Sequence, residues 1–476
     1  MTPKSKLVGR ERECSELQRV MESDRSEFVI VYGRRRVGKT FLVDQYFQGT
    51  YDFTFVGGHN IPRQRQLASF ARALKKHNGQ NYAKFLDWFD AFEALEDYLE
   101  SLDADRKKVV FIDEMPWIDT QKSDFVAALE SFWNGWAARR SDVVFIASGS
   151  ATSWMVDNLI ENQGGLHARI TCSIYVRPFT LHEVEEYLQK KRCKWDRYQI
   201  LQCYMVFGGI PFYLSLINPR ESLVQNVDRL FFARGGIMRS EFDELYNALF
   251  SNADLYIGVV KALAAHHDGM SRSEVSKAIG VTGGTLTRVL TNLERCDFIS
   301  RSQSFGSKTK DAIYRLVDFY TLFYYKFILP DSSGDEQWWS HNFESRQVAT
   351  WQGLTFEIVC LIHTDSIKRA LGISGMAAEV SSWRKTATDG QKGGQIDLVI
   401  KRADRIIHLC EMKFCKAEYR ITEAYEQLLR QRLELFQTTT KTKYALVITF
   451  VTTYGVADGL HHSLVHSEVT MNQLFG

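Results

Sequence analysis

The sequence lacks an excess of charge of one sign. Lys and Arg number 59 and Asp and Glu number 57, which gives a formal net charge of +2 over 476 residues. This balance excludes a chain whose overall charge attracts nucleic acid, so any basic surface must be local. With 45% hydrophobic and 24% charged residues the chain is neither disordered nor fibrous. At roughly one domain per 150 residues, a chain of this length has room for about three domains.

Metal-binding cysteine patterns and long apolar runs are also missing. The eight cysteines form no C-x-x-C pair and no spacing typical of a zinc knuckle or a disulfide framework, which favours reduced, mostly buried thiols. The most apolar stretch, residues 320–329, falls well short of the roughly 20 residues that a membrane span needs. The first residues carry no apolar signal-peptide core. We therefore expect a cytoplasmic protein with no membrane partner.

Apolar strands alternate with helical stretches in the first third of the chain. Residues 28–32, 107–114 and 142–148 read as buried strands, and residues 85–102 between them have a helical pattern. Such alternation predicts parallel strands with crossover helices, hence an α/β layer fold. From about residue 178 the pattern becomes helical, and no internal repeat or low-complexity tract interrupts it.

The last third of the chain predicts a second α/β unit. Residues 331–336 are short, polar and turn-rich, which is typical of a linker. A helix is expected around 351–370, followed by two apolar runs, 396–400 and 406–414, whose short connection predicts a β-hairpin. A helix over 422–436 and a strand over 444–450 follow.

A glycine-rich motif follows the first apolar strand. Gly33, Gly38, Lys39 and Thr40 in GRRRVGKT match G-x-x-x-x-G-K-[ST] at a helix start. The loop N–H groups and the helix dipole can face phosphates, Lys39 can reach the β- and γ-phosphate oxygens, and the Thr40 hydroxyl can hold Mg²⁺. We expect ATP to contact Gly33, Arg34, Arg35, Arg36, Val37, Gly38, Lys39, Thr40 and Phe41. The three arginines face either a polyanion or solvent, and solvent is favoured.

An acidic pair ends the second apolar strand. Asp113 and Glu114 close VVFIDE at the strand end where open α/β sheets place ligands. Asp113 is expected to bind the metal through water, and Glu114 to polarise the attacking water. The alternative is a plain helix cap. The motifs together predict hydrolysis of ATP and not binding alone.

Five motifs in this order resemble prokaryotic AAA-like and STAND-type ATPases with a C-terminal nuclease-like domain. They are LVGRERE (7–13), GRRRVGKT (33–40), VVFIDE (109–114), IASGS (146–150) and GGIPFYL (208–214). The resemblance implies that Val8, Gly9 and Arg10 lie by the adenine, that Pro211 packs on the base, and that Ser148 or Ser150 senses the γ-phosphate. It also implies that Arg169 stabilises phosphoryl transfer, in cis or from a neighbouring subunit, although a surface arginine is an equal alternative.

Residues 254–316 predict a helix-turn-helix with a β-wing. Thr282, Thr285, Thr287 and Arg288 are expected at the exposed start of the recognition helix, and Lys308 and Lys310 in the wing. These side chains can contact DNA phosphates, which predicts salt-sensitive binding with little sequence preference. The alternative is a lid without DNA contact.

Acidic residues and a lysine gather on the C-terminal hairpin. Asp397 opens one strand, and Glu411 and Lys413 stand two apart on the next, hence on one face. With Glu357 on the preceding helix they resemble the PD-(D/E)xK nuclease core, and Gln427 resembles that family's helical glutamine. Mg²⁺ is expected at Glu357, Asp397 and Glu411, with Lys413 orienting water or stabilising charge. An inactive relic is the alternative.

We therefore expect an α/β multidomain protein: a P-loop NTPase core, a helical lid, a winged helix-turn-helix and a restriction-endonuclease-like α/β domain. The expected boundaries are 1–177, 178–250, 251–330, a linker over 331–345, and 346–476. The predicted function is ATP hydrolysis that gates Mg²⁺-dependent phosphodiester cleavage, with DNA as partner. The alternative is a nucleotide-switched DNA-binding or signalling scaffold. Self-association or a partner protein stays open.

Overall fold

The computed structural model describes residues 7–103, 105–161, 164–250, 252–306, 312–385, 387 and 393–476. The chain forms two compact units that divide between Pro178 and Phe179. Within the described ranges, every helix is too short or too polar to span a bilayer.

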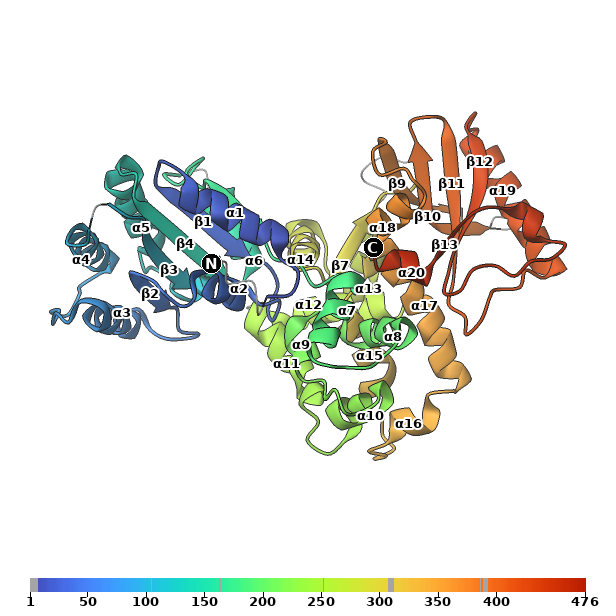
Figure 1. The fold of residues 1–476 in the computed structure, drawn as a ribbon, viewed down its shortest axis with the longest axis horizontal. Coiled ribbons are helices and arrows are strands. Elements are labelled where there is room, and N and C mark those ends of the chain that lie inside the picture. Colours follow the sequence, from blue (N-terminus) through green and yellow to red (C-terminus); the bar gives the residue numbers. More distant parts are fainter. Residues whose placement is uncertain are drawn as a thin grey trace. The chain divides into compact units, whose positions relative to one another are not determined.

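A parallel five-stranded sheet with the order β2-β3-β4-β1-β5 forms the centre of the first unit (Figure 1). Strands β1, β3 and β4 are buried on both faces almost along their whole length, which explains their continuous apolar sequences. Because β4 lies between β1 and β3, the carboxyl ends of these three strands are neighbours. The strands are β1 (Glu27–Tyr32), β2 (Phe53–Val56), β3 (Lys108–Asp113), β4 (Val143–Gly149) and β5 (Cys172–Tyr175). The helices are α1 (Glu11–Glu22), α2 (Lys39–Phe47), α3 (Arg63–Asn78), α4 (Trp88–Glu100), α5 (Phe125–Gly135) and α6 (Thr152–Met155).

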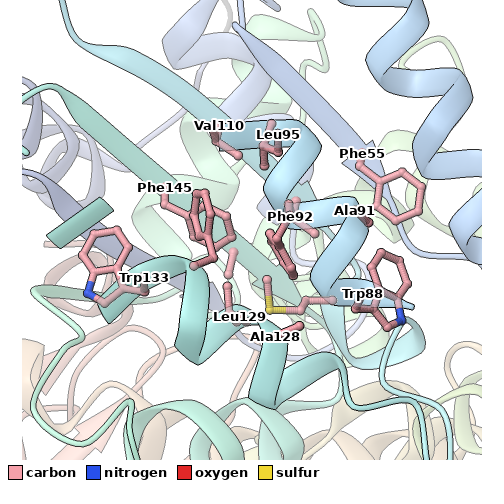
Figure 2. Packing of buried hydrophobic residues seen from close by; sticks show 14 of the residues in the cluster. Phe55, Trp88, Ala91, Phe92, Leu95, Val110, Ala128, Leu129, Trp133 and Phe145 are labelled. Atoms are coloured by element: carbon pink, nitrogen blue, oxygen red, sulfur yellow. The ribbon is translucent and has the colours of Figure 1, made fainter. Parts of the chain in front are cut away.

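Helices α4 and α5 pack their aromatic faces on this sheet (Figure 2). Phe92 of α4 stacks on Phe132 of α5 with ring centroids 5.1 Å apart. Trp88 meets Phe125 edge to face at the same centroid distance, 5.1 Å. Such pairs add to the hydrophobic stabilisation of the helix pair on the sheet. The cluster also contains Phe55, Leu95, Val110, Leu129, Trp133 and Phe145.

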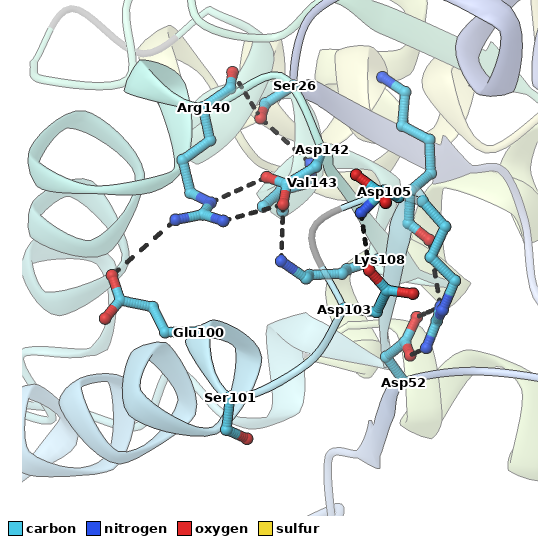
Figure 3. A network of polar contacts seen from close by, with 12 residues as sticks. Ser26, Asp52, Glu100, Ser101, Asp103, Asp105, Lys108, Arg140, Asp142 and Val143 are labelled. Atoms are coloured by element: carbon cyan, nitrogen blue, oxygen red, sulfur yellow. Dashed lines mark hydrogen bonds and ion pairs between the residues drawn. The ribbon is translucent and has the colours of Figure 1, made fainter.

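An ion-paired network ties together the starts of β3 and β4 (Figure 3). Lys108, whose side chain is 0% exposed, places Nζ 2.6 Å from Oδ2 of Asp142. Nε of Arg140 donates to the other oxygen of Asp142 at 2.8 Å, and Arg140 also lies 3.9 Å from Glu100. Since the strands are parallel, this network holds the end of the sheet opposite to the carboxyl ends of the strands.

The second unit begins with helices and contains a small module. The first helices are α7 (Leu181–Lys190), α8 (Arg197–Phe207), α9 (Pro211–Ser215), α10 (Leu223–Val227) and α11 (Ile237–Leu249). We call residues 252–306 and 312–316 the small module. It contains α12 (Ala253–Ala264), β6 (Met270–Ser271), α13 (Arg272–Ile279), α14 (Gly283–Arg295), β7 (Ile299–Ser302) and β8 (Ile313–Leu316). Its strands pair antiparallel in the order β6-β8-β7.

The segment predicted as a linker, residues 331–345, is packed rather than free. It contains α16 (Trp338–Asn342), and its Trp339 is 1% exposed. Trp339 meets Phe323, Phe327 and Trp351 at ring-centroid distances of 5.1, 5.2 and 6.0 Å. The segment predicted as a linker thus packs the apolar ring of Trp339 into the second unit. The flanking helices are α15 (Phe319–Phe323), α17 (Arg346–Ile362) and α18 (Thr364–Ala370).

A mixed five-stranded sheet with the order β13-β12-β11-β10-β9 completes the second unit. Strands β9, β10 and β11 are antiparallel, as the hairpin prediction requires, whereas β11, β12 and β13 are parallel. The strands are β9 (Ala378–Lys385), β10 (Gly394–Arg402), β11 (Ile406–Lys413), β12 (Ala445–Thr452) and β13 (Val465–Thr470). Helix α19 (Glu423–Thr440) connects β11 to β12, and α20 (Met471–Leu474) follows β13.

Candidate functional site

At two positions of the glycine-rich loop between β1 and α2, the backbone has a conformation that requires glycine. Gly33 has φ +146°, and a Cβ there would lie 2.4 Å from the carbonyl oxygen of Val176. Gly38 has φ +88° and forms the N-terminal cap of α2. The loop therefore curls tightly and presents the start of a nine-residue helix, whose N–H groups and dipole favour an anion.

Lys39 is held inside the loop. Its side chain is 5% exposed, and Nζ donates to the carbonyl oxygens of Gly33 and Arg34 at 3.1 Å each. Nζ also donates to Oγ of Ser150 at 3.2 Å. A phosphate group at the loop can replace these neutral acceptors with charged oxygens, which bind an ammonium group more strongly.

Two hydroxyl groups converge on Asp113 at the carboxyl end of β3. Oγ1 of Thr40 donates to Oδ2 of Asp113 at 2.7 Å, and Oγ of Ser148 on β4 donates to Oδ1. Hydroxyl and carboxylate oxygens are the ligands that Mg²⁺ prefers, and this cation usually keeps several waters. The residues present thus fit Mg²⁺ bound to a nucleotide, with Thr40 and Asp113 as its protein-side holders.

Glu114 follows directly and is held by Ser150, which comes just after β4. Its backbone has φ +47°, an unusual conformation for a residue with a side chain. Its carboxylate accepts hydrogen bonds from Oγ of Ser150 and, at 3.1 Å, from the backbone N–H of Ser150. Ser150 therefore contacts both Lys39 and Glu114, so the sequence-predicted residues of the loop and of two strand ends meet in one place.

The N-terminal motif contacts the phosphate loop. Arg10 is 6% exposed, and its Nη2 donates to the carbonyl oxygen of Val37 at 3.2 Å, while Nη1 lies 3.2 Å from Glu13. Val8 is 5% exposed and Gly9 has φ +58°. Arg10 thereby supports the loop, and contact of Val8, Gly9 and Arg10 with a base stays a prediction.

The arginines of the loop are less exposed than the sequence suggests. Arg34 is 2% exposed, so the prediction that it faces solvent is wrong. Arg35 and Arg36 are half-buried, and Arg36 has φ +74°. The tight curl of the loop turns these side chains back toward the protein. Phe41, by contrast, is 50% exposed on α2.

Arg169 and Pro211 are the two further residues predicted at the nucleotide. Arg169 is exposed in a turn before β5, and its backbone N–H donates to the carbonyl oxygen of Leu166 at 3.0 Å. Pro211 belongs to the second unit, where it is the first residue of α9. The proposed roles of Arg169 in phosphoryl transfer and of Pro211 at the base stay predictions.

The predicted DNA-contacting residues of the small module are exposed where they are described. Thr282, Thr285, Thr287 and Arg288 lie on the open side of α14. Nη2 of Arg272 donates to the carbonyl oxygen of Gly283 at 2.8 Å and to Oγ1 of Thr287 at 3.2 Å, which fixes the start of this helix. Lys308 and Lys310 lie outside the described residues.

A second cluster of charges lies on β10 and β11. Asp397 is inside β10 and not at its start, at a point where the pairing with β9 shifts register. Such a bulge redirects a side chain. Glu411 and Lys413 lie at the carboxyl end of β11, and Nζ of Lys413 is 3.8 Å from Glu411. Glu357 lies on α17, which packs on β11.

Each strand carboxylate of this cluster is paired with an arginine. Oδ1 of Asp397 accepts from Nη2 of Arg315, on β8 of the small module, at 2.8 Å and from Nε2 of Gln395 at 2.9 Å. Glu411 accepts from Nη1 of Arg432 and, at 2.7 Å, from the hydroxyl of Tyr425. Arg315, Tyr425 and Arg432 were not predicted. Tyr425 and Arg432 stand seven residues apart on α19, a spacing that places them on one helix face and could have nominated them.

Glu357 interacts electrostatically with the same charges. Burial raises the pKa of Glu357 to about 8, and the charge of Asp397 adds to the rise, whereas Lys413 and Arg315 oppose it. Glu357 is therefore largely protonated at neutral pH. The oxygen donors of the cluster suit a divalent cation, but in the described part of the chain no group of three or more His, Cys, Asp or Glu side chains is gathered to hold one. The arginines supply the positive charge in this arrangement.

A cleft of about 690 Å³ opens beside this cluster. Gln395 and Arg432, the partners of the two carboxylates, both line it, as do Arg384, Lys385 and Gln431. Gln427, the predicted family glutamine, is exposed and is not among its lining residues. The helical glutamine at the cleft is thus Gln431, one turn further along α19.

Comparison with known proteins relates the first unit and the start of the second to an ATPase domain. Residues 7–217 match the family model described as an ATPase domain predominantly from Archaea. An uncharacterized protein of Methanocaldococcus jannaschii is 25% identical over 335 residues, which cover 70% of this chain and 71% of that protein. A Walker-type ATPase of Pyrococcus abyssi shares 17% identity over 68% of this chain and 97% of that chain, with a TM-score of 0.49. The ORC2 protein of Aeropyrum pernix, in ADPNP and ADP complexes, shares 15% identity over 68% and 94% of the two chains, with a TM-score of 0.41.

The P-loop geometry and the family match agree on the class of the first unit. The matched residues contain the phosphate loop, Asp113, Glu114 and Ser150. The match therefore supports an ATPase domain of the archaeal type over residues 7–217.

Proposed function

We propose that the protein hydrolyses ATP at the site formed by Lys39, Thr40, Asp113 and Glu114. The contacts between Thr40, Asp113, Ser150 and Glu114 carry this proposal, because they bring the loop, β3 and β4 to one point. Lys39 and the N–H groups of α2 bind the β- and γ-phosphates, and Thr40 and Asp113 hold Mg²⁺, which neutralises phosphate charge. Glu114 orients the attacking water and accepts its proton as a general base.

Binding of nucleotide is tested first with Lys39→Ala. The variant loses the one ammonium group that the loop encloses, so we expect its affinity for a fluorescent ATP analogue to fall at least tenfold. Lys84→Ala, an exposed lysine of the same unit, is the matched control and should bind like the wild type. Equal affinities of the wild type and Lys39→Ala would remove the proposed phosphate site.

We propose as a second function that the C-terminal cluster cleaves DNA phosphodiester bonds with Mg²⁺ and that the nucleotide state gates this cleavage. The support is the position of Asp397 on β10 and of Glu411 and Lys413 on the paired strand β11, beside a cleft with basic lining. A divalent cation at such carboxylates activates water and stabilises the charge that develops on the phosphate. Lys413 orients that water, and Arg384 and Lys385 at the cleft attract the phosphate backbone.

Cleavage of circular and linear DNA with Mg²⁺, with and without ATP, tests this second function. Asp397→Ala should abolish cleavage, while Glu379→Ala, an exposed carboxylate of the same sheet, should not. Lys39→Ala should remove the effect of ATP on cleavage. Cleavage that survives Asp397→Ala lies elsewhere, and equal cleavage by the wild type and Lys39→Ala under all nucleotide conditions excludes gating.

A nucleotide-switched DNA-binding or signalling scaffold is the competing proposal. The exposed face of α14, with Thr282, Thr285 and Arg288, supports it. In this case Glu411→Ala keeps the cellular activity, whereas a nuclease loses it. Binding of DNA by the scaffold should weaken steeply with salt, because few of these side chains read bases. Arg169 acting on a neighbouring copy would add self-association to either function.

A further inference from the structure

The small module is docked on the edge strand of the C-terminal sheet. Residues 303–305 pair with β9: the backbone N–H of Phe305 donates to the carbonyl oxygen of Ser382 at 2.7 Å, and that of Ser382 donates to Gln303 at 3.2 Å. The ring of Phe305 lies 5.0 Å from the ring of Phe436, in an apolar cluster with Trp383. An extended segment has thus been added to an open sheet edge.

Arg315 extends from this docked module into the carboxylate cluster. It is 7% exposed, and its Nη2 donates to Asp397 at 2.8 Å and to the carbonyl oxygen of Asp268 at 3.3 Å. Its Nε is buried and has no hydrogen-bond partner among the described residues. A guanidinium group with an unused donor is held here by the charge of Asp397 and by the docking of its strand, and not by a complete set of hydrogen bonds.

The two arginines of the cluster differ in how they are anchored. Arg432 lies on α19, which packs on β10 of the same sheet, so it moves with Glu411. Arg315 comes from β8, 82 residues before Asp397. Its hairpin contacts β9 through the two backbone hydrogen bonds and the hydroxyl pair of Ser302 and Ser382, and it contacts α19 through the ring of Phe305. Arg315 itself contacts β10 through the ion pair with Asp397. A small shift of the module therefore removes Arg315 while Arg432 stays.

We propose that Arg315 is a releasable counter-ion that keeps Asp397 from binding a divalent cation until the small module undocks from β9. The proposal rests on the cleavage function proposed for this site and describes its regulation. A guanidinium group and a divalent cation compete for the same oxygen and repel each other at this distance. By linkage, a cation that binds Asp397 must weaken the docking of residues 303–305 by the same factor by which docking weakens the binding of the cation.

Binding of Mn²⁺ to the full chain, measured without nucleotide by electron paramagnetic resonance, tests the competition. The part of the signal that Asp397→Asn removes is assigned to this site. We expect Arg315→Gln to bind Mn²⁺ there at least tenfold more tightly than the wild type, and Arg315→Gln combined with Asp397→Asn to lose it. Arg301→Gln, an exposed arginine on β7 of the same hairpin, should match the wild type.

The other results separate the two proposals. Equal affinity of the wild type and Arg315→Gln at Asp397 overturns the counter-ion role and leaves the metal site in place. No Mn²⁺ at Asp397 in any variant overturns both. Hydrogen exchange can be measured on the wild type, so this test does not depend on whether a variant folds. Saturating Mn²⁺ should speed exchange at the N–H groups of Phe305 and Ser382. Unchanged or slower exchange with Mn²⁺ bound at Asp397 overturns the release of the module.

Discussion

Ser150 joins the charged groups of the nucleotide site at the scale of single residues. Its hydroxyl accepts from Lys39 and donates to Glu114, and its backbone N–H also donates to Glu114. A ligand phosphate that draws Lys39 away from Ser150 changes only one of these contacts. Ser150 therefore keeps Glu114 in place while the lysine changes partners.

We predict that Ser150→Ala lowers ATP turnover about tenfold, because Glu114 loses the hydroxyl that orients its carboxylate. The affinity for ATP should change less than the turnover, because Lys39 and the loop N–H groups still bind the phosphates. Steady-state kinetics on the full chain gives both values, and Ser173→Ala, an exposed serine on β5, is the control. Turnover that matches the wild type would show that Ser150 does not position Glu114.

The buried pair of Lys108 and Asp142 is a stability feature of the same unit. Asp142→Asn leaves the fully buried ammonium of Lys108 without its carboxylate, which should lower the free energy of unfolding by about 3 kcal/mol. The hydrogen bond from Arg140 holds the pKa of Asp142 well below its ordinary value, so its contribution is present at neutral pH and is lost as the pH falls below about 4.

Unfolding of the first unit, followed by tryptophan fluorescence, checks this prediction. At pH 7 the Asp142→Asn variant should unfold at lower temperature than the wild type, and the difference should shrink as the pH falls below 4. Asp97→Asn, an exposed aspartate of α4, should leave the transition unchanged. A difference that does not depend on pH would assign the effect to something other than the ion pair.

At the scale of elements, α4 and α5 stabilise the sheet through fully buried side chains. Leu95→Ala removes a leucine that is 0% exposed within this cluster and should cost about 3 kcal/mol. Leu86→Ala, at a leucine that is 71% exposed, should cost little. Thermal unfolding of the two variants makes the comparison, and equal effects would contradict the described packing.

A buried histidine connects two helical elements of the second unit. Nε2 of His363 accepts from the backbone N–H of Leu181 at the start of α7, and Nδ1 donates to the carbonyl oxygen of Val359 on α17. Both contacts need the neutral ring. Burial lowers the pKa of His363 to about 4, so folding disfavours the protonated form.

We predict that His363 lowers the free energy of unfolding of the second unit by about 3 kcal/mol as the pH falls from 6.5 to 4, because the unfolded chain takes up the proton first. This contribution is complete above pH 6.5. In His363→Gln the unfolding transition should depend less on pH in this range, whereas His466→Gln, at an exposed histidine, should behave like the wild type. An unchanged pH dependence in His363→Gln would contradict the prediction.

Elements with a local pattern could be predicted from the sequence, and others could not. Strands β1 and β3 and the β10–β11 hairpin have continuous apolar runs bounded by turn residues. Strands β2 and β5 were missed because they have four residues each and lie at sheet edges. Strand β13 also lies at a sheet edge, and only one of its six residues is buried, so it lacks a continuous apolar run. Asp397 is interior to its strand because β10 begins at Gly394, in residues whose sequence is polar and glycine-rich.

Contacts between distant residues had no local signal at all. The pair of Arg315 and Asp397 joins residues 82 apart, and nothing in the strand around Arg315 distinguishes it from a surface arginine. The burial of Arg34 depends on how tightly the loop curls, which the motif does not state. Charge compensation at the C-terminal cluster is therefore a property of the folded second unit.

At the scale of the whole molecule, the two sets of functional groups lie in different units. The ATPase site belongs to residues 7–178, and the paired carboxylates belong to residues 179–476. If the ATPase site gates the carboxylate cluster, it must do so by changing the position of an element of the second unit. The docked small module is the element whose displacement alters the charge at Asp397.

Turnover of ATP by the full chain with Mg²⁺ tests the central claim most directly. Glu114→Gln keeps the size and the hydrogen-bonding oxygen of the side chain but cannot draw a proton from water, so turnover should fall at least 100-fold with ATP still bound. Glu93→Gln, an exposed glutamate of α4, should hydrolyse like the wild type. Turnover by Glu114→Gln equal to that of the wild type would contradict the account of this site.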